Sequence, residues 1–414
     1  MAFAFLAYTL LKRNNGRWKE GMIFNSQRKE LVMNFDFTEE QKSMMELGRD
    51  FAEKEILPTQ EQDEKQHLFR KEIFKKMAEL GFFGCIIPEK YGGNETGHLC
   101  AALLTEEIGR VSASWTLPFN MQMWGPAFTI LHYGTEEQKE KYIPKLVSGE
   151  LIGAFAITEP NSGSDVAGMG TTATETDDGF ILNGQKMWIS NAHVADVALV
   201  YAYTDKSKKH KGISCFLVEL KNTPGIKTAP IETKLGLFCA PTGEIAFEDA
   251  KIPKSALLGQ KGEGFKICMW QLNNTRLGCA ARGVGIARGC HEAAIKYALE
   301  RTQFGQPIAE FQMIQDQLAT MYVEYEAARL LVLKAAYEKD QGNLNNTLSV
   351  STAKYYASEA AVNASGIAMK IFGSYGYSSE YPVERFFRDA KSLQVVEGTS
   401  NIQKIIISRA ILGK

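Results

Sequence analysis

The spacing of apolar positions changes twice along the chain and divides it into three regions. Residues 34–147 show helical spacing, and breakers such as Gly81 and Pro88 divide them into separate helices. Short runs rich in β-branched and aromatic residues fill residues 151–258, with turn dipeptides between them. From Gly262 onward the helical period returns. The pattern predicts helices, then a compact β region, then a second helical region.

The second helical region contains one long apolar stripe with steps of three and four residues. Such a stripe is typical of a helix buried in a bundle. Gly342 is expected to end that helix, and Asn345 with Asn346 to open the next one. The stripe consists of Ile314, Leu318, Met321, Tyr325, Ala328 and Val332.

The β region carries two turn signals, Asp178-Gly179 and Asn183-Gly184, and each is expected to form a type I′ hairpin. No long helical pattern separates the strands, so we expect an antiparallel sheet rather than a βαβ array. No GxGxxG motif follows a strand, which argues against a Rossmann domain.

These regions predict an α+β protein of several domains. A helical domain should span residues 33–150, an antiparallel β domain residues 151–260, and a helical bundle domain residues 261–414. In the extension of residues 1–32 a short apolar run precedes the basic residues, the reverse of a secretory signal. A transit peptide is an alternative that Glu20 and Glu30 weaken, and we expect the native chain to begin at Met33.

Charge and cysteine usage narrow the function classes. The formal net charge of −1 gives no electrostatic reason to expect nucleic acid or a membrane as a partner. The seven cysteines are scattered and form no CxxC pair, and the six histidines lack metal-ligand spacing. We therefore expect no disulfide framework, no metal site and a reducing cytoplasm.

The residue patterns of four segments are not explained by the packing of helices or strands alone. They are AITEPNSGSD at residues 156–165, KMWISNA at 186–192, RTQFGQPI at 301–308 and VVEGTSNIQ at 395–403. Together they resemble the acyl-CoA dehydrogenase family, from about residue 34 to the C-terminus, and the short-chain and glutaryl-type branch in particular. The resemblance implies a helical domain, a central antiparallel β domain and a C-terminal four-helix bundle. It also implies FAD as cofactor and an acyl-CoA thioester as the substrate oxidised at its α,β bond.

The resemblance makes Glu397 the catalytic base that removes the α-proton of the thioester. Burial would raise the pKa of this carboxyl towards the working pH, as a general base requires. The alternative is that Glu397 only caps the last helix through its backbone. Some relatives place the base at a position that matches Thr275 here, and threonine cannot act as that base.

A redox cofactor is required because no side chain accepts the β-hydride. The resemblance implies that flavin N5 lies on the substrate face opposite the carboxylate. A core tryptophan is the alternative role for Trp188. The implied contacts are Phe155, Ile157, Thr158, Trp188 and Ser190, with Thr399 and Asn401 from the segment that holds Glu397.

A further set of cofactor contacts is implied to come from a neighbouring subunit, which makes the expected enzyme a homotetramer. A fixed guanidinium suits a pyrophosphate, although Arg301 in a surface salt bridge is the alternative. Lys370 and Ser374 depart from the glutamine and glycine that relatives often carry. The set comprises Arg301, Gln303, Phe304, Lys370 and Ser374.

The expected substrate contacts are Ser164, Arg276 and Gly398, and the thioester carbonyl is implied to bind the Glu397 amide. Residues 112–126 match part of an acyl-pocket wall and carry no charge. Glutaryl-specific relatives supply an arginine where this chain has Thr116, so we expect a neutral acyl group. Val396 stands where relatives often carry an aromatic residue, which leaves a short straight, branched or alicyclic group open.

The resemblance implies an electron-transferring flavoprotein as the electron acceptor. Three alternatives stay open: a flavin monooxygenase or nitroalkane oxidase, an acyl-CoA reductase that runs the reaction backwards, and a non-enzymatic nucleic-acid-associated relative. The third is disfavoured because the chain is near neutral.

Overall fold

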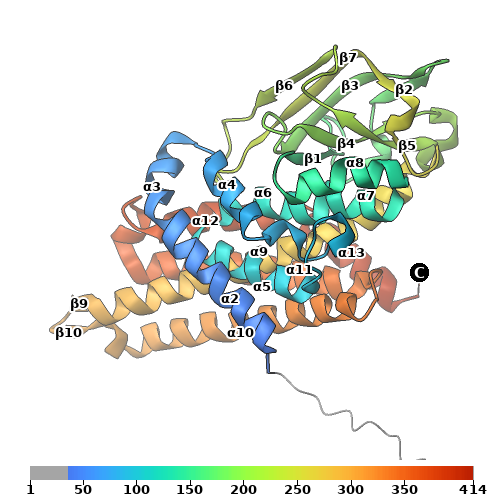
Figure 1. The fold of residues 1–414 in the computed structure, drawn as a ribbon. Coiled ribbons are helices and arrows are strands. Elements are labelled where there is room, and N and C mark those ends of the chain that lie inside the picture. The colour runs from blue at the N-terminus through green and yellow to red at the C-terminus, as the bar shows by residue number, and fades with distance from the viewer. Residues whose placement is uncertain (1–35, 414) are drawn as a thin grey trace, which may run out of the picture. The chain divides into compact units, whose positions relative to one another are not determined.

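The structure, a computed structural model, describes residues 36–413, so the predictions for residues 1–32 lie outside the described part of the chain. The first helices cover one side of the molecule beneath the sheet (Figure 1). They are α2 (Glu39–Phe51), α3 (Leu57–Gln66), α4 (Lys71–Glu79), α5 (Gly97–Val111), α6 (Ala113–Gln122), α7 (Phe128–Tyr133) and α8 (Glu136–Val147).

Two buried amide side chains fasten these helices to the sheet. Gln122 at the end of α6 donates to the carbonyls of Leu146 and Leu151, at 2.6 and 2.7 Å, and accepts from the backbone of Gly153. Gln138 in the capping box of α8 donates to the carbonyls of Ser255 and Leu257. Satisfied buried amides of this kind fix the position of the sheet on the helices.

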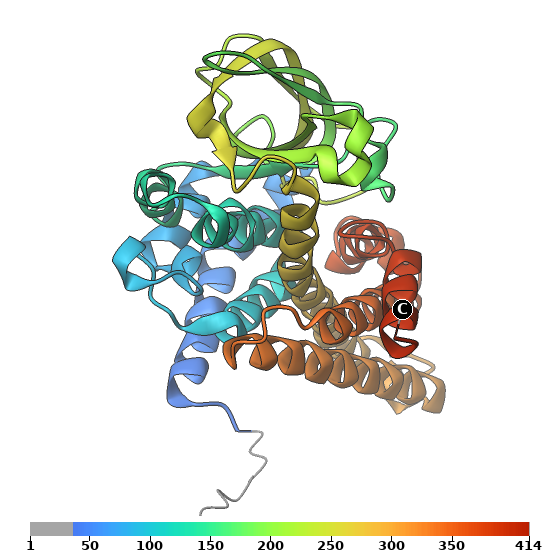
Figure 2. The same cartoon turned by 90° about the vertical axis from the view of Figure 1, so that its right-hand side faces the viewer.

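The sheet has the strand order β6-β7-β3-β2-β4-β5-β8, with β1 paired to β4, and it curls strongly when seen end-on (Figure 2). The prediction of an antiparallel sheet is wrong for β1, which runs parallel to β4, and at one bridge between β2 and β4. A β2–β3 hairpin supplies the crossover that a parallel pair needs, so no helix is required. The strands are β1 (Gly153–Ala156), β2 (Thr172–Glu175), β3 (Gly179–Ser190), β4 (Val197–Tyr203), β5 (Ile213–Glu219), β6 (Ile226–Pro230), β7 (Thr242–Pro253) and β8 (Leu257–Leu258).

One of the two predicted hairpins forms, but without the expected type I′ turn, because neither Asp178 nor Gly179 has a positive φ. Asp178-Gly179 lies in the turn between β2 and β3, where Glu175 pairs with Phe180. The second prediction is wrong, because Asn183-Gly184 lies inside β3 at a register shift against β7. Gly184 has φ +142°, and a Cβ there would lie 2.6 Å from Thr171 Oγ1, so glycine serves a bulge rather than a turn.

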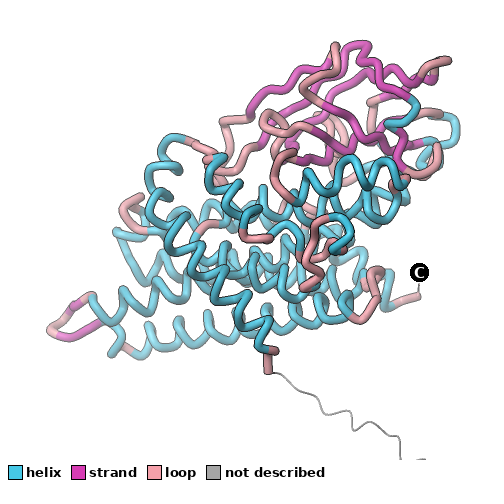
Figure 3. Tube along the Cα trace, in the orientation of Figure 1, coloured by secondary structure: helices cyan, strands magenta, loops and turns pink. Residues whose placement is uncertain are grey.

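The C-terminal region is helical, as predicted, and the α+β fold class is confirmed. Its long helices run side by side, and two small strands form a hairpin that projects at one end of them (Figure 3). Met321, Tyr325, Ala328 and Val332 of the predicted stripe are buried, and α10 ends just before Gly342. The elements are α9 (Gly264–Glu300), β9 (Thr302–Gln303), β10 (Gln306–Pro307), α10 (Gln312–Asp340), α11 (Thr347–Phe372), α12 (Pro382–Leu393) and α13 (Ser400–Ile411).

All seven cysteines are free and buried. Burial raises the pKa of the Cys85 thiol to about 11 and that of Cys268 to about 12. Among the described residues, no helix combines the length and apolarity that crossing a membrane requires. Residues 36–413 also hold no group of three or more side chains suited to bind a metal ion.

Candidate active site

The loop between α12 and α13 holds Glu397 in a left-handed backbone conformation, with φ +58°, and Gly398 follows at φ +83°. A left-handed glutamate is strained and persists only when its surroundings fix it. Arg276 Nε on α9 donates to the Glu397 carbonyl at 2.8 Å, and Gln403 Nε2 donates to the same oxygen at 3.1 Å. Gln403 also reaches the Gly398 carbonyl at 2.8 Å.

Lys354 on α11 holds both ends of this loop. Its ammonium donates to the carbonyls of Leu393 at 2.7 Å and Gly398 at 2.8 Å, and the side chain is fully buried. Desolvation lowers the pKa of Lys354. A buried cation on two carbonyls fixes the backbone on either side of Glu397.

The Glu397 carboxylate faces the first half of α9. Thr275 Oγ1 donates to Glu397 Oε2 at 2.8 Å. Desolvation raises the pKa of Glu397, while the Thr275 hydrogen bond and the charges of Arg276, Lys354 and Arg282 act in the opposite direction. A carboxyl poised this way can serve as a general base near neutral pH.

The capping alternative for Glu397 finds no support in the geometry. Thr399 caps α13, with its hydroxyl accepting from the Ile402 amide at 3.2 Å. The Glu397 carbonyl accepts from the side chains of Arg276 and Gln403, and no backbone amide of α13 donates to it. Asn401, on the first turn of α13, is exposed.

The predicted flavin contacts lie on neighbouring segments of β1 and β3. The Met187 amide donates to the Thr158 carbonyl at 2.9 Å, which ties the two segments together. Ile157 is buried, whereas Phe155, Thr158 and Ser190 are half-buried.

Trp188 is 52% exposed and has φ +61° at a register shift between Lys186 and Ile189. The bulge turns the Trp188 ring outward, so this side chain is not a core tryptophan. Its large flat face suits stacking on a ligand.

Sequence reasoning missed a buried ion pair beneath these segments. Lys186 Nζ lies 2.8 Å from Glu159 Oε1 and donates to the Ile157 carbonyl at 3.1 Å. Glu159 also accepts from Thr171 Oγ1 at 2.5 Å and from the Gly170 amide. The available signal was an opposite pair of charges, Glu159 in one motif segment and Lys186 in the other, each beside predicted flavin contacts.

Three parts of the chain approach the first half of α9: the loop of residues 394–399 that holds Glu397 (the base loop), the acyl-pocket wall of residues 112–126, and the segments at β1 and β3. The charges of Lys186, Arg276 and Glu397 all act on the buried thiol of Cys268. A Cβ at Gly278 on α9 would lie 2.7 Å from the Trp124 ring, and a Cβ at Gly125 would lie 3.7 Å from Phe155. One chain therefore brings Glu397 and the apolar wall to the same helix, with Phe155 at the end of β1 beside that wall.

The two remaining predicted substrate contacts differ in their surroundings. Ser164 is exposed in the segment that follows β1. Arg276 is only 6% exposed, and its Nε is committed to the Glu397 carbonyl. The hydrogen bond that Arg276 makes in this structure holds the loop of Glu397.

The other predicted cofactor contacts lie at the opposite end of α9. Arg301 follows Thr275 by 26 residues, or about 39 Å of helix. Its guanidinium lies 5.6 Å from the centre of the Tyr375 ring, beside a surface where Phe304 is 94% exposed. Gln303, Lys370 and Ser374 are exposed as well. The structure does not bring this group to the base of the same chain.

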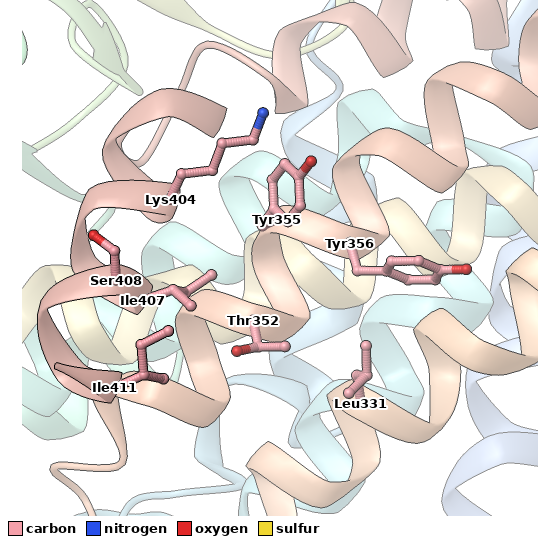
Figure 4. A pocket seen from close by; sticks show the side chains of 8 residues that line it. All are labelled: Leu331, Thr352, Tyr355, Tyr356, Lys404, Ile407, Ser408 and Ile411. Atoms are coloured by element: carbon pink, nitrogen blue, oxygen red, sulfur yellow. The ribbon is translucent and has the colours of Figure 1, made fainter.

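An apolar groove of about 380 Å³ lies on the outer face of the C-terminal helices (Figure 4). Leu331 of α10, Tyr355 and Tyr356 of α11, and Ile407 and Ile411 of α13 line it. Glu397 is not among its lining residues, so this groove is distinct from the candidate active site.

Three family models match the chain. They describe the N-terminal, middle and C-terminal domains of acyl-CoA dehydrogenase, and they match residues 38–150, 154–250 and 262–412.

Individual relatives match over nearly the whole length. A glutaryl-CoA dehydrogenase from Desulfococcus multivorans is 50% identical over 92% of this chain and 98% of its own. A subunit of the caffeyl-CoA reductase–Etf complex from Acetobacterium woodii is 43% identical over 91% of this chain and 100% of its own. The structure of butyryl-CoA dehydrogenase from Megasphaera elsdenii matches with a TM-score of 0.90 and 40% identity, over 92% of this chain and 100% of that one.

Proposed function

The chain belongs to the acyl-CoA dehydrogenase family, and we propose that it oxidises the α,β carbon–carbon bond of a neutral acyl-CoA thioester with Glu397 as the base. The observation that carries this proposal is the Glu397 carboxylate, fixed by Thr275 and raised in pKa by desolvation. Its fixed loop lies against the helix that also contacts the apolar wall at Trp124.

The residues on β1 and β3 fit FAD. The exposed Trp188 ring offers a flat apolar face, and the half-buried Thr158 and Ser190 offer hydroxyls to polar edges of a ring system. The buried Lys186–Glu159 pair keeps Thr158 in place by holding the Ile157 carbonyl. FAD supplies the two-electron acceptor for the β-hydride that no side chain can provide.

Glu397 contributes through its side chain and its backbone. The carboxylate takes the proton from the α-carbon, and the apolar wall of residues 112–126 keeps water from competing for it. Within the described residues the Glu397 amide has no backbone acceptor. It is therefore free to donate to the thioester carbonyl and stabilise the enolate-like charge there.

A neutral acyl group fits the wall best. Thr116, where glutaryl-specific relatives carry arginine, is fully buried and donates to the Ala113 carbonyl at 2.7 Å. It offers no cation to a distal carboxylate, and desolvating that carboxylate unpaired would be costly. Val396, before the base, leaves room for a short straight, branched or alicyclic group.

An acyl-CoA reductase is the second candidate. The observation that favours it is the 43% identity to a subunit of the caffeyl-CoA reductase–Etf complex. That name also supports an electron-transferring flavoprotein as the partner of this chain. We keep dehydrogenation as the main proposal because the relative that is 50% identical carries the name of a dehydrogenase. Glu397 suits both directions, since its carboxylate takes the α-proton in dehydrogenation and its carboxylic acid returns that proton in reduction.

We further propose a homo-oligomer, a tetramer by family resemblance, working in a reducing cytoplasm. Arg301, Gln303 and Phe304 follow the C-terminal end of α9, far from Thr275 and the Glu397 carboxylate. Lys370 and Ser374 lie at the end of α11, which packs against that end of α9 through Phe372 and Tyr297. A second copy would receive them at its FAD site, and the apolar groove between α10, α11 and α13 offers additional area for packing between copies.

The test is anaerobic titration of the flavoprotein with acyl-CoA esters while flavin absorbance is followed. The panel contains butyryl, isobutyryl, hexanoyl, cyclohexanecarbonyl and glutaryl thioesters, with Glu397→Gln run alongside. We expect a neutral ester to bleach the flavin, and Glu397→Gln to slow this roughly a hundredfold or more. Bound flavin that no ester bleaches would exclude the proposed reaction, and bleaching by glutaryl-CoA alone would exclude the neutral substrate class.

A further inference from the structure

The Glu397 carboxylate has a partner whose role the proposed reaction leaves undefined, the hydroxyl of Thr275. This side chain is 5% exposed and lies on α9, next to Arg276. Its oxygen lies 2.8 Å from Glu397 Oε2 and 3.4 Å from the Leu272 carbonyl of its own helix. A hydroxyl has one proton to donate, so the shorter contact receives it.

We propose that Thr275 is a positioning residue for the base: its hydroxyl binds Oε2 of the ionised Glu397 and leaves Oε1 as the oxygen that takes the α-proton. This inference rests on the proposed function of Glu397. Thr275 and Arg276 then act as neighbours on one turn of α9, the first on the carboxylate and the second on the carbonyl of the same residue.

The backbone alone does not orient the carboxylate. Arg276, Gln403 and Lys354 bind main-chain oxygens of the loop, so they fix where the Glu397 side chain begins. The Thr275 hydroxyl, in contrast, donates a hydrogen bond to the carboxylate itself. Fixing a reacting group at both ends is the preorganisation that proton transfer requires.

The same hydrogen bond affects proton affinity, because a donor to the charged form lowers a carboxyl pKa. The charged groups that face Glu397 are Arg276 and Arg282 on α9 and Lys354 on α11, and the thiol of Cys268 on α9 is coupled to it. All of them remain when only the hydroxyl is removed. Thr275→Val should therefore raise the pKa of Glu397 and deplete the carboxylate at lower pH.

The experiment measures the rate of flavin reduction in a single anaerobic turnover at saturating acyl-CoA, as a function of pH. Thr275→Val should move the acid limb up by about one pH unit, the size expected for losing one hydrogen bond to a charged group. At high pH the rate of flavin reduction in Thr275→Val should equal that of the unaltered enzyme. Thr275→Ser should return the acid limb of the pH profile to its original position. Thr223→Val is the matched control, because that part-buried hydroxyl donates to the Glu219 backbone carbonyl and not to a carboxylate.

An unmoved acid limb in Thr275→Val overturns the inference, as does an equal loss at every pH that Thr275→Ser fails to recover. Thr275→Ala repeats the test if the valine variant does not fold. Glu397→Gln distinguishes a failure of the proposed base from a failure of the proposed role of Thr275. If that variant reduces flavin at the normal rate, the proposed base is wrong. If it is slow while Thr275→Val keeps the normal pH profile, only the role of Thr275 is wrong.

Discussion

The loop before α13 and the hairpin after α9 share an unusual backbone. In the loop, Glu397 and Gly398 have φ +58° and +83°, and in the hairpin Phe304 and Gly305 have φ +54° and +82°. Two successive left-handed residues are what a two-residue type I′ turn requires, and Gln303 pairs with Gln306 across that turn. In the hairpin, the pairing of β9 and β10 thus accounts for the left-handed phenylalanine.

The loop at Glu397 lacks such a ladder and depends on distant side chains instead. Arg276, Lys354 and Gln403 hold its carbonyls, whereas Phe304 is 94% exposed and a Cβ at Gly305 would meet nothing within 4 Å. Similar local geometry therefore serves two purposes. One turn is held in place by side chains of its own chain, and the other is exposed on the surface of the single chain.

The largest expected effect comes from removing the clamp on the loop. Lys354→Met removes two charge-assisted hydrogen bonds and leaves the Leu393 and Gly398 carbonyls with Ser358 and Gln403 as their remaining side-chain donors. We expect the free energy of unfolding to fall by about 2–4 kcal/mol. Denaturant titration measures the change. Lys334→Met is the control, because its side chain is 61% exposed and its pair with Glu338 is worth little. Equal small losses in both variants would show that Lys354 does not support the loop.

The glycines of the two turns give a direct comparison. Gly305→Ala should cost about 1 kcal/mol, since only the left-handed backbone opposes alanine. Gly398→Ala adds a Cβ 2.8 Å from Gln403 Nε2 and 3.3 Å from Arg276 Nη2. We expect about 2–3 kcal/mol there and slower flavin reduction. Equal costs for the two substitutions would remove the distinction between the turns.

Residues at the β9–β10 hairpin should affect cofactor binding more than the stability of the single chain. Arg301→Ala should weaken FAD binding about tenfold, which is the loss expected for one charge-assisted contact to a phosphate. Flavin retained after dialysis is the measurement, and Lys296→Ala on the same end of α9 is the control. Normal retention in Arg301→Ala would remove this residue from the cofactor site.

The smallest effect is expected at the hairpin tip. Phe304→Ser should change the unfolding free energy of a dilute sample by less than about 0.5 kcal/mol, because the ring is 94% exposed in the single chain. At high protein concentration a larger loss should appear, since packing against a second copy would then be broken. No concentration dependence would contradict the outward role of this turn.

Local patterns predicted the order of elements but not their long-range pairing. The parallel partnership of Gly153 with Val197 joins residues that no local pattern connects. Asn183-Gly184 carried a correct signal for a left-handed glycine, yet pairing with β7 on either side turned the expected hairpin into a bulge.

At the site, the motif segments pointed to Glu397 and to the residues on β1 and β3. The supports of the base were invisible, because Thr275 and Lys354 reach their partners across 122 and 44 positions of sequence. Such contacts depend on how α9 and α11 pack, which apolar periodicity predicts only as burial.

The buried cysteines have a practical consequence for the hairpin. With all seven thiols enclosed, reagents that modify sulfur find no native target on the folded surface. A single cysteine introduced at the exposed Thr302 can then carry a fluorescent or spin label without background. The distance between two such labels would report directly on how far apart the hairpins of neighbouring copies stand.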